Sequence, residues 1–250
     1  MGRLIVSGLR NELKMACHGL RSTPGIRFLI FAQGRTGSTL LTSTLDTHPE
    51  ITCHDEILGV PRAFPMAYVE NTARAHGVKC FGFHVKIYQL TTWQRITNVS
   101  IWLEKMSTRG WKILYLRRQN ILKQIVSNAF AEAAGIYHHR QGQNTKRPNQ
   151  IDIPVDKLYR SISWRLTQLD AERKALNGLD YLELLYDRDL ETPDSQRQTF
   201  ERIQSFLDVD VINLKARLQK AVNRPMSQLI SNYDEVHSAL LGTEYEIFLN

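Results

Sequence analysis

A short polar turn between two apolar segments is the first place in the chain where residue types and spacing could do chemistry. Residues 27–41 read RFLIFAQGRTGSTLL: a strand-like half, a turn over residues 34–39, and leucines typical of a helix. A glycine-containing turn from strand to helix lets backbone N–H groups and the helix N-terminus face an anion. We therefore expect a phosphate-like anion here, approached closely by the glycine backbone and gripped by Arg35.

This turn differs from the Walker A loop, which has four residues between its glycines and a lysine after the second one. Here two residues separate Gly34 from Gly37, and Ser38 takes the place of the lysine. The usual lysine contact with a γ-phosphate is therefore missing, which disfavours nucleotide hydrolysis but not phosphate binding. Taken alone, the turn is equally compatible with a plain connection that needed glycine.

A second strand–turn–helix pattern carries basic and hydroxyl side chains. Residues 111–130 read WKILYLRRQNILKQIVSNAF, with Arg117 and Arg118 at the end of the expected strand and Ser127 nine residues after Arg118. A guanidinium and a hydroxyl at this separation could hold one phosphate group from two sides. The alternative is a solvated arginine pair and a serine on a helix surface.

Apolar runs and helical patterns alternate along the chain, and they would position these residues. Strands are expected over residues 27–32, 80–85, 112–116 and 181–185. Helices are expected over residues 38–46, 61–76, 93–107, 121–134, 154–176 and 194–206. The alternation predicts an α/β fold, a central parallel sheet with helices on both faces. Residues 1–25 are expected to form an N-terminal helix or extension, and residues 1–250 a single domain.

Composition narrows the classes of partner. The net charge is +7, but no run of Lys and Arg exceeds two residues, so a nucleic-acid-binding tail is not expected. No apolar run approaches the ~18 residues of a membrane span. The three cysteines show no metal or disulfide spacing, which favours a reducing, cytoplasmic location and predicts no metal. The adjacent pair His138 and His139 is expected to lie on a loop surface.

Several motifs, taken in order, resemble the sulfotransferases that use 3′-phosphoadenosine 5′-phosphosulfate (PAPS). They are GRTGSTLL, YLRRQN…VS, YLELLYDRDLETP and ERIQSFLDVD. CFGFHVKIYQL and LISNYDEVHSALLGTEYEIFL resemble the bacterial branch that modifies carbohydrates and small molecules. The resemblance covers roughly residues 27–245. It implies a P-loop-like fold related to nucleotide kinases, and transfer of a sulfuryl group to a hydroxyl or amine of a small-molecule or saccharide acceptor.

The resemblance also implies which residues hold PAPS and its product, adenosine 3′,5′-bisphosphate (PAP). The residues that match the 5′-phosphosulfate loop are Arg35, Thr36, Gly37, Ser38 and Thr39. Arg118 and Ser127 match the 3′-phosphate motif, with Arg117 as the alternative to Arg118. Near the C-terminus, Lys220 or Arg224 could close over the nucleotide, or each could be a plain surface charge.

A general base must lie within hydrogen-bond reach of the acceptor's proton. In the segment HPEITCHDEIL, residues 48–58, Glu56 best matches the carboxylate that this branch uses, and His54 is the next candidate. Asp55 stands where the branch has glycine. His84 replaces the branch's usual lysine, and Lys86 lies two residues on, on the same face of a strand. Either side chain could touch the bridging oxygen or the acceptor.

Two other functions compete with this interpretation. One is a P-loop nucleotide kinase or hydrolase, which the missing lysine disfavours. The other is a catalytically inactive scaffold that keeps the nucleotide site, which the departures at Asp55 and His84 favour. The acceptor, the choice between O- and N-sulfation and the oligomeric state are not encoded in any motif of the chain.

Overall fold

The structure, a computed structural model, describes residues 22–135, 148–216 and 224–249, together with Glu12, Lys14, Met15 and Cys17. The chain forms two compact units. The first, called the sheet unit here, comprises Met1–Arg117 and Asp170–Gln219. The second, called the helical unit, comprises Arg118–Leu169 and Lys220–Asn250. That both units form one domain stays a prediction.

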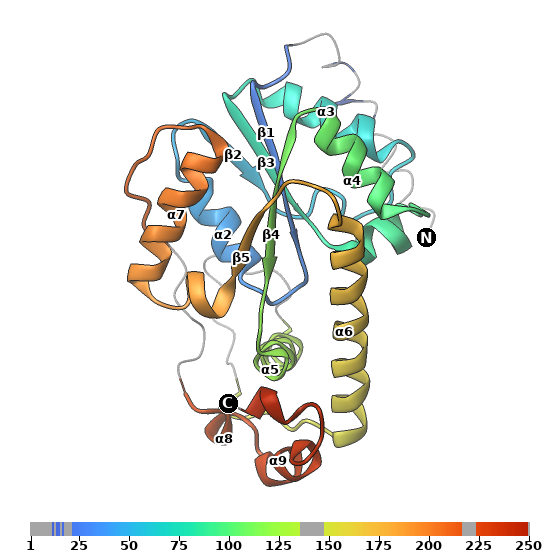
Figure 1. Cartoon of the computed structure of the whole chain (residues 1–250), viewed down its shortest axis with the longest axis vertical. Helices are drawn as coiled ribbons and strands as arrows, with labels where there is room; N and C mark the ends of the chain where they lie inside the picture. The colour runs from blue at the N-terminus through green and yellow to red at the C-terminus, as the bar shows by residue number, and fades with distance from the viewer. Residues whose placement is uncertain are drawn as a thin grey trace. The chain divides into compact units, whose positions relative to one another are not determined.

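The sheet unit is built on five parallel strands in the order β2-β3-β1-β4-β5 (Figure 1). The strands are β1 (Ile26–Ala32), β2 (Ile51–His54), β3 (Cys80–Val85), β4 (Trp111–Arg117) and β5 (Leu182–Leu185). Parallel strands need crossover connections, and the intervening helices supply them. The predicted fold class, a parallel sheet flanked by helices, is confirmed.

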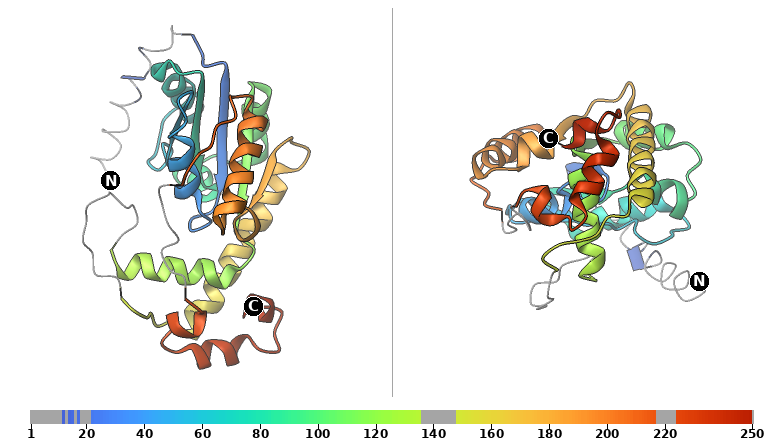
Figure 2. Two further views of the ribbon diagram at one scale, coloured as in Figure 1. Left: turned by 90° about the vertical axis from the view of Figure 1, so that its left-hand side faces the viewer. Right: turned by 90° about the horizontal axis from the view of Figure 1, so that it is seen from below.

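Helices cover both faces of this sheet (Figures 1 and 2). Helices α2 (Ser38–Leu45) and α7 (Pro193–Leu207) lie on one face, and α3 (Pro65–His76) and α4 (Val99–Thr108) lie on the other. Successive side chains of a strand point to opposite faces. Accordingly, Phe28 and Ile30 of β1 belong to the core cluster that includes residues of α2 and α7. Leu29 and Phe31, which point to the opposite face, are also fully buried. Both faces of β1 are therefore buried, as expected for a central parallel strand.

Two single π-helical turns come directly after, or close to, the carboxyl ends of strands. The turn η1 (Gln89–Trp93) comes four residues after the end of β3, and η2 (Tyr186–Leu190) follows β5 without a break. Such turns are rare in proteins, and those that occur are often found at functional sites. They bring Gln89 and Tyr186 to the edge of the sheet where the strands end.

The helical unit contains α5 (Ile121–Ala133), most of α6 (Val155–Leu176), α8 (Met226–Leu229), α9 (Tyr233–Leu240) and the short 3-10 helix η3 (Glu246–Leu249) (Figure 2). Its core joins apolar residues of α5 and α6 to those of the C-terminal elements. The buried Asn120 caps α5 by accepting from the N–H of Lys123, and its amide donates to the carbonyl of Phe248. One side chain thus fixes the start of α5 against the C-terminal segment.

Some predicted boundaries were wrong. The helix predicted over residues 61–76 begins at Pro65, where proline at the first helical positions fits the helix. The helix predicted over residues 93–107 begins at Val99, because the side chain of Asn98 accepts from the N–H of Ile101 and caps it. Strand β2 and helices α8 and α9 were not predicted. Most of the polar segment 138–152, including His138 and His139, lies outside the described residues.

Candidate functional site

The turn after β1 occupies the topological switch point of the sheet. Strand β1 pairs with β3 on one side and β4 on the other, so the chain builds one half of the sheet and then returns to build the other. In open parallel sheets, ligands bind outside the carboxyl ends of the strands at this point. The turn that the sequence singled out therefore lies where this fold class places its ligands.

The backbone of this turn combines left-handed residues with N–H groups at a helix N-terminus. Gly37 and Arg35 adopt left-handed conformations, with φ of 94° and 70°, and the hydroxyl of Thr36 donates to the carbonyl of Gln33 at 2.8 Å. Within the described part of the chain, the backbone N–H groups of residues 36–39 donate to no hydrogen bond. They stand at the N-terminus of α2, whose dipole favours negative charge. The turn thus offers a row of available donors.

Glycine is required at one position of the turn by a close contact. A Cβ atom on Gly37 would lie 2.5 Å from a ring carbon of Tyr186, the first residue of η2. A Cβ atom on Gly34 would lie 3.9 Å from the Nζ atom of Lys86. The aromatic ring therefore packs on the start of α2, and an ammonium group lies beside the other end of the turn.

Glu56 lies in a network with two groups that follow β3. Its Oε1 atom is 2.5 Å from Nζ of Lys86, and its Oε2 atom accepts from Nε2 of Gln89 at 2.5 Å. The backbone N–H of Lys86 donates to Oε1 of Gln89 at 2.9 Å, which fixes the amide in turn. Both carboxylate oxygens are held, and the side chain is only 15% exposed. A carboxylate in this setting is oriented and paired with a cation.

His84 lies behind this network rather than at its surface. It is fully buried, with Nδ1 3.2 Å from Oδ1 of Asp55 and Nε2 3.3 Å from the carbonyl oxygen of Ala32. Its Nδ1 atom is also 3.8 Å from Oε1 of Glu56. Both ring nitrogens thus face oxygen acceptors, and the ring links the ends of β1 and β2.

Asp55, Glu56 and His84 form a group of metal-ligand type whose ligand atoms all lie within 4.8 Å of one another. The sequence spacing gave no sign of this group, because the three residues meet only where adjacent strands end. The ammonium group of Lys86 already places a positive charge 2.5 Å from Glu56. The expectation that the protein uses no metal stays a prediction.

His54 contacts His76 of α3. Its Nε2 atom is 3.0 Å from Nε2 of His76 on α3, and the two rings are 4.5 Å apart. Burial, followed by the nearby His76, lowers the pKa of His54. The structure therefore brings Glu56, His84 and Lys86 together, and it places His54 in a separate pair.

The two predicted arginines have different surroundings. Arg117, in the sheet unit, donates from Nε to Glu183 on the neighbouring strand at 2.8 Å. Arg118, in the helical unit, donates from Nη1 to the carbonyl of Lys123 at 3.3 Å. In an α-helix this carbonyl faces the N–H of residue 127, so Arg118 lies along the turn of α5 that carries Ser127. Within the helical unit, Arg118 and Ser127 therefore lie along the same turn of α5.

The predicted cations near the C-terminus are only partly described. Arg224 is exposed, and its guanidinium donates to the carbonyl of Asn149 at 2.7 Å. Lys220 lies outside the described residues.

A buried polar network supports the turn and was missed by the sequence analysis. The fully buried Glu172 accepts from the hydroxyl of Tyr115 at 3.2 Å and from the amide of Gln33 at 3.4 Å. Burial, together with Glu172, raises the pKa of Tyr115. Gln33 in turn accepts from Thr36 through its carbonyl. No spacing in the sequence relates residues so far apart in the chain.

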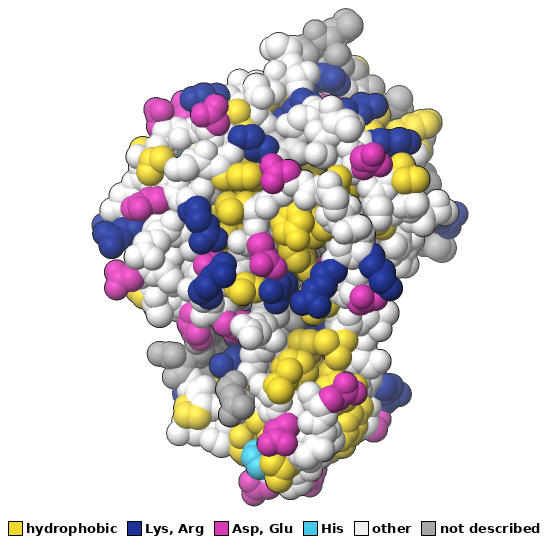
Figure 3. Space-filling model, viewed as in Figure 1, with side chains coloured by type: hydrophobic (Ala, Val, Ile, Leu, Met, Phe, Trp, Pro, Cys, Tyr) yellow, Lys and Arg dark blue, Asp and Glu magenta, His cyan; other side chains and the backbone are white. Residues whose placement is uncertain are grey.

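Several surface charges elsewhere in the sheet unit are paired. Figure 3 shows Lys and Arg side chains interspersed with Asp and Glu over β5 and α7. Asp189 accepts from Arg188, and Arg202 lies 3.6 Å from the same carboxylate. Within the described residues, no helix has the length and apolar character needed to cross a membrane.

Comparisons with known proteins give limited similarity. No family model matches the chain, and no curated protein matches it. Among solved structures, the chain is similar to mouse sulfotransferase SULT7A1 complexed with PAP, with a TM-score of 0.43 and 11% sequence identity. The match covers 81% of this chain and 64% of the mouse protein, so the chain spans a little under two thirds of that protein's length.

Proposed function

We propose that the protein is a PAPS-dependent sulfotransferase that transfers a sulfuryl group to a hydroxyl or amine of a small-molecule or saccharide acceptor. One observation carries the proposal. In the turn after β1, the backbone N–H groups of residues 36–39 donate to no hydrogen bond within the described part of the chain, and the Glu56–Lys86 pair, which joins a candidate base to a cation, lies beside this turn. A sulfuryl transferase needs this combination, an anion cradle next to a proton acceptor.

The turn fits the 5′-phosphosulfate end of the donor. Its N–H groups, the hydroxyl of Ser38 and the guanidinium of Arg35 supply the donors that an anion of this kind needs. Lys86 adds an ammonium group beside Gly34. Arg118 and Ser127, which lie along one turn of α5, are the residues proposed for the 3′-phosphate. When bound, PAPS supplies the sulfuryl group on a leaving group that needs no metal.

Glu56 is the proposed general base. Lys86 and Gln89 hold its two oxygens, so the carboxylate is oriented before the acceptor arrives. Glu56 takes the proton of the attacking hydroxyl or amine. The ammonium group of Lys86, which lies beside the turn after β1, stabilises the negative charge of the sulfuryl group and the leaving phosphate. His84 is too deeply buried to reach the acceptor and acts as a positioning residue for Asp55 and Glu56. His54 remains the alternative base.

Calorimetric titration with PAP tests the donor site. Arg35 has φ of 70°, so Arg35→Gly removes the guanidinium without adding backbone strain. Ser127→Ala removes the proposed 3′-phosphate hydroxyl. Each change is expected to weaken PAP binding about tenfold, the loss of one charge-assisted hydrogen bond. The matched control is Arg95→Gly, because Arg95 also has positive φ. Unchanged affinity in both site variants would remove the proposed donor site.

A further inference from the structure

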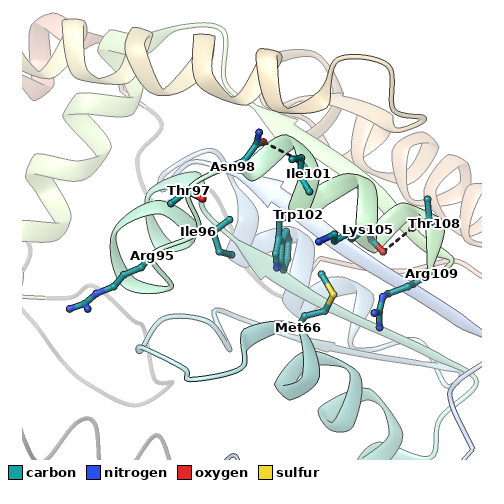
Figure 4. A pocket seen from close by; sticks show the side chains of 10 residues that line it. All are labelled: Met66, Arg95, Ile96, Thr97, Asn98, Ile101, Trp102, Lys105, Thr108 and Arg109. Carbon is teal, nitrogen blue, oxygen red and sulfur yellow. Dashed lines mark hydrogen bonds between the residues drawn. The ribbon is translucent and has the colours of Figure 1, made fainter.

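A pocket of about 670 Å³ lies on the α3–α4 side of the sheet unit (Figure 4). It is lined by Met66 of α3, by residues 95–98 that precede α4, and by Ile101, Trp102, Lys105, Thr108 and Arg109. This volume is typical of small-molecule sites. None of the described residues proposed for PAPS or for catalysis lines it. The pocket therefore needs an explanation of its own.

The charged groups of this pocket are all positive. Arg95, Lys105 and Arg109 are exposed, and no acidic residue of the described chain lines the pocket with them. Their side chains form no ion pair or hydrogen bond with the described residues, whereas Arg27, Lys86 and Arg188 of the same unit are paired with acids. In Figure 4, Lys105 and Arg109 lie on one side of Trp102, and Arg95 extends at the other end. Unpaired cations around a hollow attract an anion.

The wall between these cations is apolar. Met66, Ile96 and Trp102 line it, and Ile101 adds a side chain that is 46% exposed. The indole N–H of Trp102 is buried and has no hydrogen-bond partner within the described part of the chain. An unsatisfied buried donor is unusual in folded proteins. The apolar side chains of the wall suit a ligand with an apolar body.

The segment that closes one end of the pocket is held rigidly. The side chain of the buried Gln94 donates to the carbonyls of Leu58 and Val60 and accepts from the N–H of Arg62. The next residue, Arg95, has φ of 54°, a left-handed conformation that is costly for a residue other than glycine. Such strained positions cluster at functional sites.

We propose that this pocket binds a small amphipathic anion, independently of the proposed sulfotransferase site. The anionic group, a carboxylate, sulfate or phosphate, lies between Lys105 and Arg109. The acyl or aryl body packs on Trp102, Met66 and Ile101. The pocket needs both parts of the ligand, because its cations select the charge and its wall supplies the apolar contact.

Calorimetric titration with octanoate tests this proposal. Octylammonium, which has the chain but a positive charge, and acetate, which has the negative charge but no long chain, are the comparison probes. Octanoate is expected to bind, and each comparison probe is expected to bind at least about tenfold more weakly. Lys105→Ala together with Arg109→Ala is expected to weaken octanoate at least about fivefold. Ile101→Glu, which places a carboxylate at an exposed helix position, is expected to abolish binding. Arg197→Ala, an exposed cation of α7 on the other face of the sheet, is the matched control.

Thermal unfolding of each variant confirms that it is folded. No octanoate binding, equal binding of octylammonium, or unchanged affinity in the double variant would overturn the proposal. Octanoate binding in Arg35→Gly separates the two sites, since this variant is expected to bind PAP about tenfold more weakly and to keep its octanoate affinity.

Discussion

At the scale of single residues, the central feature is a carboxylate with both oxygens held. Glu56 follows β2, whereas Lys86 and Gln89 follow β3, and the parallel strands bring the three side chains to one edge. The sequence analysis named Glu56 and Lys86 separately. It did not predict that they pair, because register between strands is set by tertiary packing.

The role of Glu56 leads to a kinetic prediction. Glu56→Gln keeps the shape of the side chain and removes the base, so we expect turnover of PAPS with an accepting substrate to fall about 10²- to 10⁴-fold. Calorimetric affinity for PAP is expected not to weaken, because Lys86 is released from its ion pair. Glu104→Gln, an exposed glutamate of α4, is the control. Normal turnover in Glu56→Gln would make His54 the leading base.

At the scale of elements, the sheet depends on one close fit between β1 and β3. Gly82 is paired in register with Phe28, and a Cβ atom at Gly82 would lie 2.1 Å from the Phe28 ring. Strand β1, which leads into the turn, and strand β3, which carries His84, therefore pack through the Phe28 ring, which lies against Gly82. In the sequence, Gly82 stands out only as part of the motif CFGFHVKIYQL.

This fit predicts a loss of stability on substitution. Gly82→Ala forces the Phe28 ring to move inside a packed core, so we expect the free energy of unfolding in urea to fall by about 1–3 kcal/mol. Gly25→Ala is the matched control, because a Cβ atom there has open space. Adding Phe28→Leu to Gly82→Ala should restore part of the loss. Equal stability of the Gly82 and Gly25 variants would contradict the packing described here.

The sequence predicted the mainly apolar strands well and missed the strand in which polar and apolar residues alternate. Apolar residues dominate strands β1, β3, β4 and β5, and this pattern reveals even β5, which has only four residues. Strand β2 has only four residues and alternates polar with apolar ones, so it was not distinguished from a loop. Gln33, Tyr115 and Glu172 form their network through contacts between distant segments, and local patterns do not report such contacts.

At the scale of the whole molecule, two features follow from the order of the strands. The return of the chain at β1 creates the switch point that carries the turn, and the crossover through α3 and α4 builds the second pocket on one face. The overall excess of positive charge is not gathered in one tract. Its unpaired part includes the cations of that pocket, while many other cations of the sheet unit are paired.

Thermal unfolding with and without PAP, with ATP·Mg as the comparison, tests the central claim most directly. A ligand at about 100 times its dissociation constant adds about 2.7 kcal/mol, which should raise Tm by several degrees. We predict a rise with PAP and none with ATP·Mg. A rise in Tm with ATP·Mg alone, or no rise with either ligand, would contradict the assignment of a PAPS site to this protein.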